Sequence, residues 1–165
     1  MNTNESPTRR TFLKTSSLVG ATTILAPHIA KADAPNNETI KIGLIGCGGR
    51  GTGATTQALR ADDNVVLWAL ADAFENKVQK TLDSLKAGFG DKVNVPAERQ
   101  FVGLDAYEKL LASGVDVVLI AGPPGFRPQH LRACIEAGKH VFAEKPVAVD
   151  IAGIKSVLET AKMAH

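Results

Sequence analysis

The chain has 165 residues, of which 44% are hydrophobic and 22% charged, and this composition excludes fibrous and intrinsically disordered proteins. The formal net charge of +2 comes from the N-terminus, because positions 33–165 hold 15 basic and 16 acidic residues. A nucleic-acid partner is therefore not expected. Two cysteines, Cys47 and Cys134, are too few for a disulfide scaffold or a thiolate cluster, and we predict no metal site.

Residues 1–32 contain, in the right order, the features of an export signal. Arg9 and Arg10 are followed by a weakly apolar stretch over 15–26 and by Ala-Lys-Ala at 30–32. This order resembles a twin-arginine signal peptide, which implies export by the Tat machinery to the periplasm or another extracytoplasmic compartment. The alternative is a disordered, mildly basic terminus. About a dozen apolar residues are too few to span a bilayer, so no stable membrane span is expected. Residues 33–38 form a polar linker.

Strands and helices alternate over residues 39–165. Strands are predicted over 39–45, 65–71, 100–102, 115–121 and 140–143, separated by amphipathic helices. The helices are expected over 52–61, from Phe74 to Leu85 with Gly88 and Gly90 at its end, around Leu110 behind an Asp105–Glu108 capping box, around Cys134, and from Ile151 to Ala161 behind an Asp150 cap. This order predicts a doubly wound α/β fold of the Rossmann type with one parallel sheet. Its ligands bind at the carboxyl ends of the strands.

A glycine-rich turn follows the first predicted strand. Gly46, Gly48 and Gly51 form GxGxxG between a buried strand and a helix, the context in which this motif binds a dinucleotide. Gly46 permits the tight turn, Gly48 the close approach of the pyrophosphate, and Gly51 the packing of the helix on the strand. Gly49 and Arg50 complete the predicted phosphate loop. Arg50 is predicted either to reach a phosphate oxygen or to remain solvated.

Asp72 ends the second predicted strand, 21 residues after Gly51. This matches the roughly 20 residues expected before a carboxylate that binds the adenosine ribose. Such a carboxylate repels the extra phosphate of NADP, and residues 73–75 supply no arginine, so NAD is favoured over NADP. The alternative is a solvated aspartate at a strand end.

Three segments together resemble the Gfo/Idh/MocA oxidoreductase family over about residues 40–165. They are the glycine turn, Gly122-Pro123-Pro124 after the fourth strand, and residues 137–142 leading into Glu144-Lys145-Pro146. The resemblance implies hydride transfer between NAD(P) and a hydroxyl-bearing carbon of a sugar, cyclitol or polyol. It adds Gly122, Pro123, Pro124, Glu144 and Lys145 to the expected coenzyme contacts. Gly122 stands where relatives often have Thr or Ser, so a hydroxyl contact would be missing.

By the same resemblance, Lys145 is the catalytic residue, with Glu144 as its orienting neighbour and Pro146 fixing the turn. An ammonium group stabilises the alkoxide character that develops as an alcohol is oxidised. Burial and the cationic nicotinamide are expected to lower its pKa toward the working pH. From position alone, Lys145 would be an exposed loop residue. His130 is expected to be a capping or surface residue rather than a substrate contact.

Members of this family continue with a second α+β domain that covers the nicotinamide. We therefore expect residues 39–165 to be a dinucleotide-binding domain truncated before that substrate domain, inactive alone and with exposed apolar surface. The full-length form is expected to be a homo-oligomer. Two alternatives are an NAD-using glycoside hydrolase of the same fold and a non-catalytic nucleotide-binding module.

Overall fold

The computed structural model describes residues 38–164, so the predicted signal peptide and the linker up to residue 37 lie outside the described part. The strands are β1 (Ile40–Ile45), β2 (Val65–Asp72), β3 (Gln100–Val102), β4 (Val117–Ile120) and β5 (His140–Ala143). The helices are α2 (Gly49–Ala61), α3 (Glu75–Phe89), α4 (Ala106–Ala112), α5 (Arg127–Glu136) and α6 (Ile151–Met163), with short 3-10 turns at Gly90–Lys92 and Ala97–Arg99. Strands and helices alternate as predicted.

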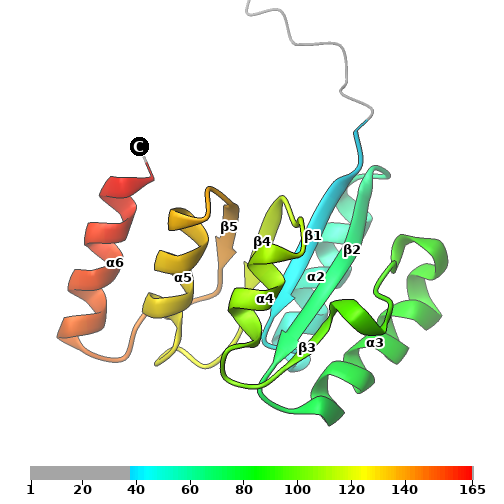
Figure 1. Ribbon diagram of the computed structural model, residues 1–165, viewed down its shortest axis with the longest axis horizontal. Coiled ribbons are helices and arrows are strands. Elements are labelled where there is room, and N and C mark those ends of the chain that lie inside the picture. The colour runs from blue at the N-terminus through cyan, green and yellow to red at the C-terminus, as the bar shows by residue number, and fades with distance from the viewer. Residues whose placement is uncertain (1–37, 165) are drawn as a thin grey trace, which may run out of the picture. The chain divides into compact units, whose positions relative to one another are not determined.

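The five strands form one sheet in the order β3-β2-β1-β4-β5, and every pairing is parallel. Helices cover both faces of this sheet (Figure 1). The strand order reverses between β1 and β4, which is the point where doubly wound sheets bind their ligands. The predicted Rossmann-type fold is confirmed.

Two apolar clusters fill the space between the sheet and its helices. On one face, Leu59 of α2 and Leu85 of α3 pack with Leu44 and Leu67 of the sheet. On the other face, α4 and α5 cover a second cluster that contains Leu110 and Cys134. Each strand at the centre of the sheet is thus buried on both faces, which explains why its sequence reads as a continuous apolar run.

Helix α2 begins at Gly49, three residues before the predicted start at residue 52. Gly48 is its N-cap, in extended conformation, and the Thr52 amide donates to the Gly48 carbonyl at 2.9 Å. Glycine has low helix propensity and no side chain to show periodicity, so the pattern concealed the first turn. The glycine motif is therefore half turn and half helix.

The predicted capping box is wrong. Asp105 stands at the N-cap of α4, but its side chain makes no cap hydrogen bond and instead pairs with Lys109 at 2.8 Å. The Glu108 carboxylate accepts from the Tyr107 hydroxyl instead. The Asp150 cap is confirmed, because its carboxylate accepts from the Gly153 amide at 2.6 Å.

Of the two glycines expected to end the second helix, only Gly90 does so. It is the C-cap, with φ +52°, whereas Gly88 lies within α3. Left-handed backbone at a helix C-terminus favours glycine because a Cβ is strained there.

Helix α6 lies beside α5, at the β5 edge of the sheet (Figure 1). The apolar side chains of its predicted face are exposed, with Ile151 at 76% and Leu158 at 59%. Phe142 of β5 is also 45% exposed. Among residues 38–164, no helix is long and apolar enough to cross a membrane.

Candidate functional site

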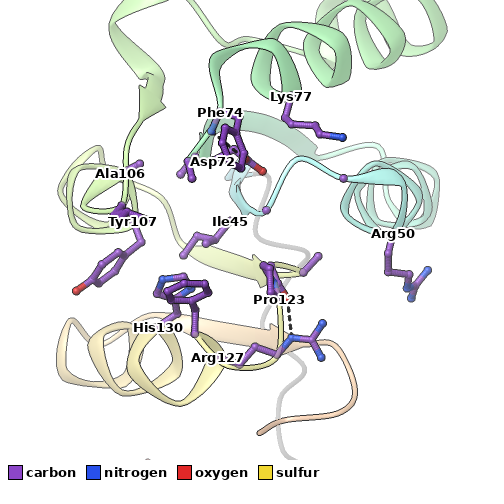
Figure 2. Close-up of a pocket in the computed structure, with 18 of the residues that line it drawn as sticks. Ile45, Arg50, Asp72, Phe74, Lys77, Ala106, Tyr107, Pro123, Arg127 and His130 are labelled. Atoms are coloured by element: carbon purple, nitrogen blue, oxygen red, sulfur yellow. Dashed lines mark hydrogen bonds between the residues drawn. The ribbon is translucent and has the colours of Figure 1, made fainter. Parts of the chain in front are cut away.

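A cavity of about 610 Å³ lies at the carboxyl ends of the strands. The segments after β1, β2, β3 and β4, together with the start of α5, line it. Figure 2 shows Asp72, Phe74 and Lys77 on one side of this cavity, with Tyr107 and His130 on another. The predicted residues in its lining are Gly46, Gly48, Gly49, Arg50, Asp72, Gly122 and Pro123.

The glycine turn is closed by contacts between backbones. Gly46 has φ +98°, and a Cβ there would lie 2.3 Å from the Gly122 nitrogen. A Cβ on Gly51 would lie 2.0 Å from the Gly46 carbonyl oxygen. No side chain fits at either position, so these two glycines set the shape of the turn.

Gly48 and Gly49 differ from these two, because a Cβ on either would meet no atom of the protein within 4 Å. The space beside them is open and borders the cavity. The first amides of α2 have no acceptor within the helix, and the helix dipole is positive at this end. The residues present therefore fit the diphosphate of a dinucleotide, whose oxygens accept from such amides.

The Asp72 carboxylate joins two turns of the site. One oxygen accepts from the Cys47 amide at 2.7 Å and the other from the Phe74 amide at 3.0 Å. Cys47 is buried in the turn. A carboxylate has about four acceptor positions, so two remain for the hydroxyls of a ribose. Asp72 thus has a structural role in the turn, and its contact with a ribose stays a prediction.

Arg50 and Glu144 form an ion pair between α2 and the end of β5. The Arg50 Nε donates to Glu144 Oε1 at 2.7 Å, and its terminal nitrogen contacts the same oxygen. The hydrogen bond from Arg50 holds the pKa of Glu144 below its usual range. The prediction that Arg50 is solvated holds only in part, because about half of its side chain is exposed while its guanidinium binds Glu144. Its contact with a phosphate oxygen stays a prediction.

Lys145 is exposed and does not line the cavity. The described residues do not bury this lysine, and its burial beside a bound coenzyme stays a prediction. The Glu144 carboxylate is engaged by Arg50, so its effect on Lys145 stays a prediction. Gly51, Pro124 and Glu144 also lie outside the lining.

His130 is neither a cap nor a surface residue. It lines the cavity, its ring lies 4.6 Å from that of Tyr107 and 6.1 Å from that of Phe126, and burial lowers its pKa. Its Nδ1 is buried and has no hydrogen-bond partner among the described residues. The sequence interpretation failed here because ring contacts between α4 and α5 leave no local pattern.

Three polar or charged residues of the lining, Tyr107, Lys77 and Arg127, were given no site role from the sequence. Tyr107 was assigned only to a helix, although its hydroxyl accepts from Gln129 at 3.0 Å beside the cavity. Lys77, five residues after Asp72, adds a positive charge to the lining. Arg127 is 6% exposed and donates to three backbone carbonyls. The available signal for Arg127 was a charged residue three positions after the Gly122-Pro123-Pro124 turn, at the start of a helix.

Known proteins resemble this chain over the described domain. Residues 40–165 match the Gfo/Idh/MocA family, described as "Oxidoreductase family, NAD-binding Rossmann fold". The chain is 28% identical over 125 residues to myo-inositol 2-dehydrogenase of Thermotoga maritima, covering 76% of this chain and 34% of that protein. It is 34% identical over 148 residues to a glycosyl hydrolase family 109 protein of Solibacter usitatus, covering 85% and 33%. The chain spans about a third of the length of these relatives.

A solved structure agrees with these matches. The WlbA dehydrogenase of Bordetella pertussis, crystallised with NADH and UDP-GlcNAcA, is 25% identical with a TM-score of 0.59, covering 77% of this chain and 35% of that one. The family match begins at the first residue of β1 and includes every described strand and helix. The chain therefore belongs to the Gfo/Idh/MocA oxidoreductase family and carries its NAD-binding Rossmann domain.

Proposed function

We propose that this chain is the coenzyme-binding part of an NAD-dependent oxidoreductase that acts on a hydroxyl-bearing carbon of a sugar, cyclitol or polyol. The observation that carries the proposal is the glycine turn. Gly46 and Gly51 are closed against backbone, whereas Gly48 and Gly49 leave open space beside the free amides of α2. A relative named as an inositol dehydrogenase supports the class of substrate.

The chain's own residues divide the work between binding and proton handling. The α2 amides bind the diphosphate, and Asp72 accepts from the adenosine ribose. When bound, NAD supplies the hydride acceptor. Lys145 donates to the substrate oxygen and stabilises the negative charge that develops there.

We also propose NAD rather than NADP as the coenzyme. The support is the Asp72 carboxylate in the cavity lining, since a negative charge there repels the 2′-phosphate of NADP. The two hydrogen bonds from the Cys47 and Phe74 amides fix this carboxylate in the turn.

Replacing Gly48 with Ala tests the proposed site. A Cβ at Gly48 meets no protein atom and its φ of −89° suits any residue, so the fold should be unaffected. The Cβ would occupy the space of the diphosphate, and the affinity for NAD should fall about tenfold or more, as measured by calorimetry. Gly53→Ala, in the same helix, is the matched control and should leave NAD binding unchanged. Equal affinity of Gly48→Ala and the native chain would contradict the proposal.

A second candidate is an NAD-using glycoside hydrolase, which the similarity to a glycosyl hydrolase family 109 protein favours. Turnover by the product of the complete reading frame separates the two candidates. A dehydrogenase reduces added NAD in proportion to a free sugar, whereas a hydrolase releases an aglycone and leaves NAD unchanged. Binding of NAD without either turnover would indicate a non-catalytic nucleotide-binding module.

We further propose that residues 1–32 direct export by the Tat machinery to the periplasm or another extracytoplasmic compartment, and that the full-length protein is a homo-oligomer. The support for export is the order of Arg9-Arg10, apolar stretch and cleavage pattern in the sequence. Residues 1–40 fused to a reporter should export it, and replacing both arginines by lysine should retain it in the cytoplasm. Export of the lysine variant would contradict the twin-arginine route.

Light scattering on the full-length protein tests the proposed homo-oligomer, and a monomeric mass would contradict it.

A further inference from the structure

Arg127 is a buried cation whose hydrogen bonds all go to backbone carbonyls. It stands at the first residue of α5 and is 6% exposed. Its Nε donates to the Gly122 carbonyl at 2.9 Å, and one terminal nitrogen donates to the carbonyls of Glu144 at 2.6 Å and Pro146 at 2.5 Å. Within residues 38–164 it forms no ion pair. Burying a charge in this way is costly unless its donors are satisfied.

The three carbonyls belong to two neighbouring turns at the ligand edge of the sheet. Gly122 follows β4, whereas Glu144 and Pro146 stand on either side of Lys145 after β5. The planar guanidinium has several donors in a fixed arrangement, so it can join both turns at set distances. Figure 2 shows Arg127 below Pro123, with its hydrogen bond to the β4 turn as a dashed line.

The contribution of Arg127 differs between the two turns. The Ala121 amide donates to the Ile45 carbonyl at 2.8 Å, so the β4 turn is also held by the sheet. The Glu144 amide donates to the Ile120 carbonyl at 2.9 Å, which is the last contact of the β5 ladder. Past Glu144, the bond from Arg127 to Pro146 takes over from the ladder. The backbone of Lys145 is therefore held on its C-terminal side by Arg127.

A second arginine holds the side chain of the same turn. Arg50 binds the Glu144 carboxylate, while Arg127 binds the Glu144 carbonyl. The turn is thus fastened from α2 and from α5, and Lys145 projects from between two fixed points. A displacement of about 1 Å at a catalytic group can reduce a rate by about 100-fold, so such fastening has functional value.

We propose that Arg127 is a positioning residue, which holds the Glu144-Lys145-Pro146 turn in register with the Gly122 turn so that Lys145 meets the nicotinamide half of the coenzyme. This inference rests on the proposed function. It predicts that Arg127 contributes to the binding of the nicotinamide half of the coenzyme. Its contribution to the binding of the adenosine diphosphate half should be small, because the glycine turn and Asp72 bind that half.

The test compares two ligands on the chain as it exists, by calorimetry. ADP-ribose carries the adenosine diphosphate half without the nicotinamide, and NADH carries both. In Arg127→Lys, which keeps the charge but loses the planar donors, NADH affinity should fall on the order of tenfold while ADP-ribose affinity stays within about twofold. Arg127→Gln should behave in the same way. Arg132→Lys, an exposed position of the same helix paired with Glu136, should change neither affinity.

Each outcome has one meaning. An unchanged ratio of NADH to ADP-ribose affinity in both variants would overturn the positioning role. So would failure of both to fold, measured by circular dichroism, because Arg127 would then serve stability alone. If the native chain binds neither ligand, the proposed coenzyme function fails instead, whatever the variants do.

Discussion

The glycine turn after β1 and the Glu144-Lys145-Pro146 turn after β5 both lie at the ligand edge of the sheet, but they are held in different ways. The first is shaped by backbone packing, in which Gly46 and Gly51 lie too close to other backbone atoms for any side chain. The second is held by side chains from elsewhere, Arg50 and Arg127. A turn fixed by its own glycines can be recognised from local spacing, whereas one fixed by distant side chains cannot.

The largest expected effect comes from breaking the backbone-packed turn. Gly51→Ala places a Cβ 2.0 Å from the Gly46 carbonyl oxygen, and neither backbone can yield without moving β1 or α2. We expect a loss of about 3 kcal/mol in the free energy of unfolding and a fall in Tm of more than about 10 °C. Thermal unfolding followed by circular dichroism measures it. Gly53→Ala is the control, and an equal Tm for the two variants would refute backbone packing as the cause.

An intermediate effect is expected from Asp72, which serves both turn and coenzyme. Asp72→Ala removes two acceptors of backbone amides and the carboxylate that faces the ribose. NAD affinity should fall about tenfold, and NADP should bind better relative to NAD because the repulsion is gone. Asp62→Ala is the control. It removes a similar local acceptor, which binds the Asn64 amide at 2.7 Å outside the cavity, and it should leave NAD affinity unchanged. An unchanged NAD-to-NADP preference in Asp72→Ala, measured by calorimetry, would remove the coenzyme assignment.

The smallest effect concerns the side-chain-held turn and pH. The hydrogen bond from Arg50 lowers the pKa of Glu144, so this pair stabilises the fold above the ordinary glutamate pKa, and the stabilisation is lost as pH falls through the lowered folded pKa. Glu144→Gln should lower Tm by about 2 °C near pH 7, because the pair is partly exposed. The difference from the native chain should shrink as pH falls below the ordinary glutamate pKa and vanish once Glu144 is protonated in the folded chain.

Glu136→Gln breaks the exposed pair with Arg132 and serves as the control for that series. It should shift Tm less than Glu144→Gln does at every pH. A Glu144→Gln difference that grows as pH falls would show that the ion pair does not stabilise the turn.

The strands and the phosphate loop were predictable because their signals are local. A buried parallel strand reads as an apolar run, and Gly46, Gly48 and Gly51 must be glycines for reasons that hold within a few residues. The start of α2 was misplaced by three residues because glycines carry no periodicity. The predicted Asp105 cap is wrong because the Asp105 carboxylate pairs with Lys109, four residues along the same helix, instead of capping it.

The sequence by itself determined the order of strands and helices, the glycine turn and the position of Asp72, since each depends on spacing along the chain. Only the tertiary structure decided that Arg127 is buried against Gly122 and Pro146, that Glu144 pairs with Arg50, and that His130 lies beside Tyr107 in the cavity. The physical reason is distance along the chain. Arg50 and Glu144 are 94 residues apart, and a hydrogen bond between them exists only once β1, β4 and β5 pair in one sheet.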